Sequence, residues 1–161
     1  MKELYRIEKD FLGEKNIEIN KYYGIQTLRA KENFDITKTD ISLFPSFIKS
    51  LAKVKKACAI TNYELGDLTD IQKDAIVQAC NEIIDGKFHD QFIVDPIQGG
   101  AGTSTNMNAN EVIANRALEI LGYEKGDYKY CHPNNHVNLS QSTNDAYPTA
   151  VKIALIYSKK K

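Results

Sequence analysis

The chain has 161 residues, of which 42% are hydrophobic, which is enough for one globular domain with its own core. Lysine plus arginine and aspartate plus glutamate both number 21, so there is no excess positive charge to hold nucleic acid or an anionic membrane. We therefore expect a small-molecule or protein partner, with no nucleic acid and no membrane.

Cysteine usage and the N-terminus indicate the compartment. Cys58, Cys80 and Cys131 are widely spaced and form no C-x-x-C motif, which disfavours both a disulfide framework and a thiolate metal site. The N-terminus carries charges where a signal peptide would be apolar, and no apolar run approaches membrane-spanning length. These features predict a cytoplasmic protein.

The first half of the chain predicts a small β element followed by two helices. Residues 5–33 mix short alternating pieces with glycines, which indicates a hairpin or irregular arm rather than a long helix. From Pro45, a helix is expected to run until Gly66. Its apolar residues recur at three- and four-residue steps and should share one buried face: Phe47, Ile48, Leu51, Val54, Cys58 and Thr61.

A second helix should begin at a capping box formed by Thr69 and Gln72 and end at Gly86. Its predicted core stripe comprises Ile76, Ala79, Cys80, Ile83 and Ile84. A third helix should run from Thr103 or Ser104 to Leu121, with Gly122 after it. A last helical pattern starts near Asp145 and is still continuing at the end of the chain.

A glycine-rich turn, residues 98–102, precedes the third helix and is followed by Thr103, Ser104 and Thr105. Unpaired backbone N–H groups and the helix dipole favour an anion at such a helix start. The phosphate-loop lysine is absent, so a nucleotide is not expected. The alternative is a tight turn before a capped helix, with no ligand.

A second polar cluster, residues 140–145, stands directly before the last helix. One side chain suffices for an N-cap, whereas Ser142, Thr143 and Asn144 offer three consecutive polar groups. Two hydroxyl-rich helix starts in one chain suggest a dicarboxylate-binding site. Simple capping is again the alternative.

His132 and His136 have the four-residue spacing of a helical metal site. Pro133 disfavours a regular helix through His132, and the glutamate of the H-E-x-x-H motif is missing, so we expect no metal there. A loop in which the histidines make hydrogen bonds is the favoured interpretation.

Three long runs resemble blocks of the aspartase/fumarase superfamily, in the same order, and the resemblance covers nearly the whole chain. Such runs are far more specific than short motifs. They are residues 22–30 (YYGIQTLRA), 98–111 (QGGAGTSTNMNANE) and 136–149 (HVNLSQSTNDAYPT).

Within the superfamily, the residues are closer to aspartases than to class II fumarases. Fumarases typically have Gln-Thr-Gly-Ser-Gly-Thr where this chain has residues 98–103, and Ser-Ser-Asn-Asp-Thr where it has residues 142–146. One departure is Asn135, because many relatives have an acidic residue there. This difference puts in doubt an accessory anion site involving His132.

The resemblance implies a mainly α fold, with a short β-hairpin or arm in an N-terminal helical domain of residues 1–140. Residues 141–161 would be the truncated start of a central helix bundle that assembles as a homotetramer. The implied activity is the reversible deamination of L-aspartate to fumarate and ammonia, without a redox or organic cofactor, in active sites built from three subunits. Thr103, Ser142, Thr143 and Asn144 would bind the substrate.

The resemblance also implies that the catalytic base is a serine in a Gly-Ser-Ser-x-Met-Pro-x-Lys-x-Asn loop, which is expected downstream of Lys161. This chain does not contain that loop, since its two methionines, Met1 and Met107, do not precede a proline. No catalytic residue is therefore assigned in these 161 residues, and the isolated chain should be inactive. The alternatives are a class II fumarate hydratase and a non-catalytic helical binding module.

Overall fold

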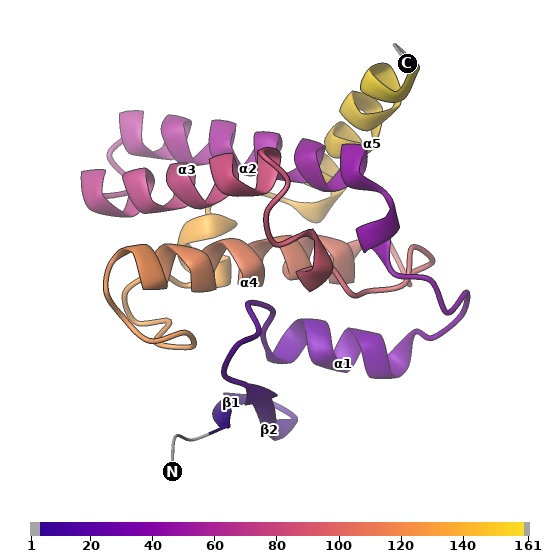
Figure 1. Cartoon of the computed structure of the whole chain (residues 1–161). Coiled ribbons are helices and arrows are strands. Elements are labelled where there is room, and N and C mark those ends of the chain that lie inside the picture. Colours follow the sequence, from indigo (N-terminus) through magenta and orange to yellow (C-terminus); the bar gives the residue numbers. More distant parts are fainter. Residues whose placement is uncertain (1–3, 160–161) are drawn as a thin grey trace.

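The computed structural model describes residues 4–159 and confirms a mainly helical fold with a short β-hairpin (Figure 1). The hairpin and the short helical turns are β1 (Tyr5–Asp10), β2 (Gly13–Glu18), η1 (Ile41–Leu43), η2 (His89–Gln91) and the π-helical turn η3 (Pro133–Val137). The longer helices are α1 (Ile25–Asn33), α2 (Pro45–Glu64), α3 (Asp70–Ile84), α4 (Thr103–Ile120) and α5 (Thr143–Lys159).

The helices are stacked in layers around α4 (Figure 1). One face of α4 packs against α3, and α1 with the hairpin lies on the opposite side. The last helix, α5, packs along α2 and also contacts α4. Apolar side chains of α2, α3 and α4 form the core between these layers, among them Ile48, Leu51, Ile76, Ile83, Val112, Ile113 and Leu118.

Helix α2 begins at Pro45 as predicted, but its buried face is rotated from the predicted one. Ile48 and Leu51 are buried, whereas Val54 and Cys58 are only half-buried and Thr61 is exposed. Because α2 packs against both α3 and α5, burial extends to a side that carries polar groups. Those buried polar residues are Ser50, Lys55 and Asn62.

The ends of α3 and α4 confirm the local signals in the sequence. Thr69 and Gln72 form both hydrogen bonds of the capping box, with Thr69 Oγ1 accepting from the Gln72 N–H at 3.3 Å. Gly86 and Gly122 follow the ends of α3 and α4 with φ values of 104° and 82°, in the left-handed region that glycine adopts without steric cost.

The last helix begins two residues before the predicted start at Asp145, because Thr143 and Asn144 already belong to α5. The predicted helical pattern continued to the end of the chain, whereas the structure describes α5 only as far as Lys159. Lys161 lies outside the described residues. The catalytic serine is expected downstream of Lys161, where the structure describes no residues, so this expectation stays a prediction.

Helix α1 was not predicted, because its start is held by a carboxylate from a distant part of the chain. Glu111, which is only 2% exposed on α4, accepts hydrogen bonds from the backbone N–H groups of Gly24, Gln26 and Thr27 at 2.8–3.0 Å. It also accepts from Thr27 Oγ1 at 2.6 Å. Burial raises the pKa of Glu111 to about 7, while these four donors favour the ionised form.

A second buried carboxylate, Glu8 of β1, joins the hairpin to the same helix start. Its Oε2 accepts from the backbone N–H of Ile25 at 2.9 Å, and its Oε1 accepts from Tyr128 Oη at 3.1 Å. Gly24 lies between these groups, and a Cβ on it would come within 2.6 Å of Tyr128 Oη and 2.7 Å of Glu8 Oε2. The glycine of the YYGIQTLRA run is therefore required by close packing.

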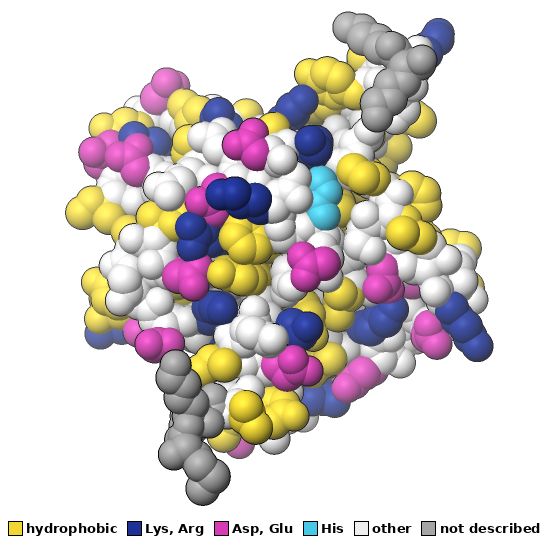
Figure 2. Space-filling view, in the orientation of Figure 1, with side chains coloured by type: hydrophobic (Ala, Val, Ile, Leu, Met, Phe, Trp, Pro, Cys, Tyr) yellow, Lys and Arg dark blue, Asp and Glu magenta, His cyan; other side chains and the backbone are white. Residues whose placement is uncertain are grey.

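Charges of both signs are interspersed over the face shown in Figure 2, in agreement with the balanced composition. Within residues 4–159, no helix combines the length and the apolar character needed to span a bilayer.

Candidate substrate-binding site

The glycine-rich turn ends in an uncapped helix start. Gly102 is the N-cap residue of α4, with φ 82°, and has no side chain to bond the first turn. The backbone N–H groups at Thr103 and Ser104 are therefore placed where a helix end leaves donors unused. The Thr103 side chain is exposed beside them.

The second hydroxyl cluster forms the start of α5. Ser142 Oγ accepts from the backbone N–H of Asn144 at 3.2 Å, so one of the predicted binding residues also acts as a capping group. Thr143 is half-buried, and Ser142 and Asn144 are exposed. Ser142 therefore takes the capping role that was the alternative in the sequence, and the substrate role of Ser142, Thr143 and Asn144 stays a prediction.

Two contacts bring these helix starts together. Asn106, on the first turn of α4, donates from Nδ2 to Thr143 Oγ1 at 3.3 Å. At the N-cap of α4, the ring of Tyr147 from α5 packs directly on Gly102. A Cβ at Gly102 would overlap that ring. Residues about forty positions apart in the chain therefore line one region, with Thr103 joined to it through Gly102.

A buried polar network supports this region and was not found from the sequence. Lys55 is fully buried, and its Nζ donates to Asn138 Oδ1 at 2.8 Å and to Gln141 Oε1 at 2.9 Å. Asn138 Oδ1 also accepts from Asn106 Nδ2 at 2.9 Å. Burial lowers the pKa of Lys55 to about 8. The only signal in the sequence was the position of Lys55, four residues after the buried Leu51.

Several buried polar atoms near the start of α4 have no hydrogen-bond partner within the described part of the chain. Such groups cost about 1–3 kcal/mol each, so they are rare in folded proteins. They are Gln98 Oε1, Thr105 Oγ1, Asn106 Oδ1 and Asn110 Oδ1.

The two histidines make hydrogen bonds with the backbone around η3. His132 Nδ1 accepts from the backbone N–H groups of Asn134 and Asn135 at 3.0 and 3.3 Å, which leaves the proton of the neutral ring on Nε2. His136 Nδ1 accepts from the backbone N–H of His132 at 2.8 Å. Burial lowers the pKa of both rings. Both are hydrogen-bonding residues of the η3 loop, as favoured from the sequence.

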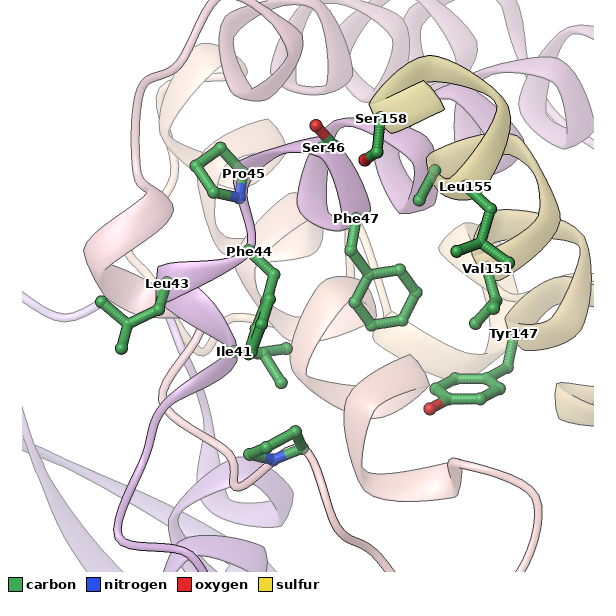
Figure 3. A pocket seen from close by; sticks show the side chains of 12 residues that line it. Ile41, Leu43, Phe44, Pro45, Ser46, Phe47, Tyr147, Val151, Leu155 and Ser158 are labelled. Carbon is green, nitrogen blue, oxygen red and sulfur yellow. The ribbon is translucent and has the colours of Figure 1, made fainter. Parts of the chain in front are cut away.

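A cavity of about 470 Å³ between η1, the start of α2 and α5 is of a different kind (Figure 3). Figure 3 shows its walls to be mainly apolar, with the rings of Phe47 and Tyr147 reaching toward each other from α2 and α5. Tyr147 separates it from Gly102. This cavity suits a dicarboxylate poorly, because its lining is mainly apolar and includes three hydroxyl side chains, Ser46, Tyr147 and Ser158, but no lysine or arginine.

Comparisons with known proteins agree with the arrangement of the helices. Residues 13–161 match a protein family described as "Lyase". The chain is 63% identical over 150 residues to the aspartate ammonia-lyase of Helicobacter pylori strain J99, covering 93% of this chain and 32% of that protein. The chain thus spans about a third of the length of the curated relatives that it matches.

Two solved structures share this fold over almost the entire chain. The crystal structure titled fumarate lyase:delta crystallin from Brucella melitensis matches with a TM-score of 0.94 and 57% identity, covering 96% of this chain and 35% of that chain. A class II fumarase from Schistosoma mansoni matches with a TM-score of 0.86 and 40% identity, covering 94% of this chain and 32% of that chain. The family match and these identities show that the chain belongs to this lyase family, together with the aspartate ammonia-lyases.

Proposed function

We propose that the protein containing this chain reversibly deaminates L-aspartate to fumarate and ammonia, and that Thr103, Ser142, Thr143 and Asn144 bind the substrate. The observation that carries the proposal is the hydrogen bond from Asn106 to Thr143, since it joins two hydroxyl-rich helix starts into one polar region. The identity to an aspartate ammonia-lyase, 63%, also exceeds the 40% to a class II fumarase.

The chemistry explains why such a region is needed. Removal of the C3 proton of L-aspartate leaves negative charge that spreads into the β-carboxylate before ammonia departs. Fixed hydrogen-bond donors around that carboxylate lower the barrier, and loss of one donor costs about 3–4 kcal/mol in other enzymes. We assign this role to Ser142 and Thr143, and assign contacts with the departing amino group to Thr103 and Asn144.

The base that removes the proton is proposed to lie outside this chain, downstream of Lys161. The hydroxyls at the two helix starts have no histidine or lysine hydrogen-bonded directly to them among the described residues, and an unperturbed hydroxyl is a poor base. By analogy with the family, we propose that a serine of a separate loop is this base. We further propose a cytoplasmic homotetramer whose active sites combine three subunits, with no cofactor required.

The rival reaction is hydration of fumarate to L-malate, which uses the same fold. It can be tested by replacing the matching segment of the Helicobacter pylori aspartate ammonia-lyase with this chain. We expect this chimaera to deaminate L-aspartate and to leave L-malate essentially untouched, because discrimination rests on the amino group. Fumarate absorbance measures both rates. Malate dehydration at a comparable rate would favour the hydratase, and no turnover by a folded chimaera would favour a non-catalytic module.

A further inference from the structure

We propose that Asn106 is a positioning residue that directs the proton of the Thr143 hydroxyl toward a substrate carboxylate, with its own orientation set by Lys55 through Asn138. This inference rests on the proposed function, because it assumes that Thr143 contacts the substrate. It adds a residue on α4 that makes no substrate contact itself and acts through Thr143.

The orientation begins at Lys55, whose ammonium group can only donate hydrogen bonds. Its contact at 2.8 Å therefore requires the oxygen of the Asn138 amide, not the nitrogen. The other end of that amide agrees, since Asn138 Nδ2 donates to the backbone carbonyl of Gln141 at 3.0 Å. The buried charge thus fixes which way Asn138 faces.

Asn138 in turn fixes Asn106. The Asn138 oxygen accepts from Asn106 at 2.9 Å, so the group facing it has to be the Asn106 nitrogen. If the Asn106 amide were reversed, two carbonyl oxygens would face each other. The second hydrogen of Asn106 Nδ2 is then directed to Thr143 Oγ1 at 3.3 Å.

The consequence concerns the Thr143 hydroxyl, which has one proton and two lone pairs. Because an amide nitrogen cannot accept, Thr143 has to accept from Asn106 and keeps its own proton for another partner. Thr143 is half-buried at the start of α5, so that partner can be a ligand. A hydroxyl with a free proton suits an acceptor such as a carboxylate oxygen.

A purely structural role for Asn106 would be to hold α4 against the loop before α5, with no effect on chemistry. Asn110 provides a matched control for this alternative. It is an equally buried asparagine one turn further along α4, its Oδ1 also lacks a partner among the described residues, and its Nδ2 contacts only Met107 Sδ at 3.5 Å. Asn110→Leu therefore controls for the loss of a buried amide from α4 without removing a contact to Thr143.

The test is a double-mutant cycle in the chimaera described above, with Asn106→Leu and Thr143→Val made singly and together. We expect Asn106→Leu to lower kcat about tenfold, as for loss of one oriented hydrogen bond, with KM changed much less. In the Thr143→Val background, the same substitution should change kcat less than about threefold, because the residue through which it acts is gone. Asn110→Leu should leave kcat unchanged.

Equal losses in both backgrounds, or no loss in a folded Asn106→Leu variant, would overturn the proposal. If Asn106→Leu does not fold, Asn106→Ala replaces it in the same cycle with the same criteria. Failure of the proposed function is distinguished by the unmodified chimaera. If the unmodified chimaera acts on L-malate instead of L-aspartate, the same cycle is measured with L-malate. If it acts on neither substrate, the cycle is measured through the affinity for fumarate, by calorimetry. Both are valid readouts, because the inferred orientation of Thr143 concerns any carboxylate.

Discussion

Replacement of Thr143 by alanine should lower kcat/KM for L-aspartate by about 10²–10³-fold in the complete enzyme, the loss observed when a preorganised donor is removed from developing negative charge. Thr143 receives its hydrogen bond from Asn106 at the junction of α4 and α5, so its hydroxyl is held in place before substrate arrives. Steady-state kinetics and thermal melts measure the two relevant quantities, activity and folding.

Thr149→Ala is the matched control, since Thr149 is exposed on the same helix. Its kcat/KM should stay within about twofold of the unmodified enzyme, as for surface substitutions away from a site. Asn144→Ala should also impair deamination more than folding. Near-native kcat/KM in folded Thr143→Ala protein would show that Thr143 has no substrate role.

The largest effect on stability is expected for Glu111→Gln, which keeps the shape of the side chain and removes its charge. The two carboxylate oxygens accept four hydrogen bonds from Gly24, Gln26 and Thr27, and an amide would present an NH₂ group to at least one of these donors. We expect the free energy of unfolding to fall by about 1–3 kcal/mol, since the amide leaves a buried donor unpaired.

Urea unfolding of the chain at pH 9, above the raised pKa of Glu111, measures this change on the ionised carboxylate, and Glu119→Gln is the control. Glu119 is exposed on the same helix and pairs with Arg116 and Tyr22 at the surface, where such pairs are worth about 0–1 kcal/mol. If the two variants were equally stable, the Glu111 carboxylate would not be what holds the start of α1.

Sequence reasoning worked where the signals were local. The start of α2 at Pro45, the capping box at Thr69 and the glycine after α4 each depend on residues within one turn, and each prediction is confirmed. Helix α1 was missed because it has nine residues and its first turn is bonded by Glu8 and Glu111, whose approach depends on the tertiary fold.

The candidate site divides in the same way. The hydroxyl-rich helix starts could be found as patterns of residue type, but what joins them could not. Lys55 was passed over because lysine is almost never fully buried, and only the packing of α2 against both α3 and α5 shows that it is. The role of Asn106 required knowing which amide atom faces Asn138.

The central claim, that this chain supplies substrate-binding groups while the base comes from elsewhere, is tested by assaying the isolated chain for fumarate formation from L-aspartate. We predict no turnover by the chain alone, however well it folds. Mixing it with the remaining segment of the Helicobacter pylori enzyme should give fumarate if the two parts reassemble. Steady turnover by the isolated chain, abolished by Thr143→Ala, would contradict the account, because it would require a base within these residues.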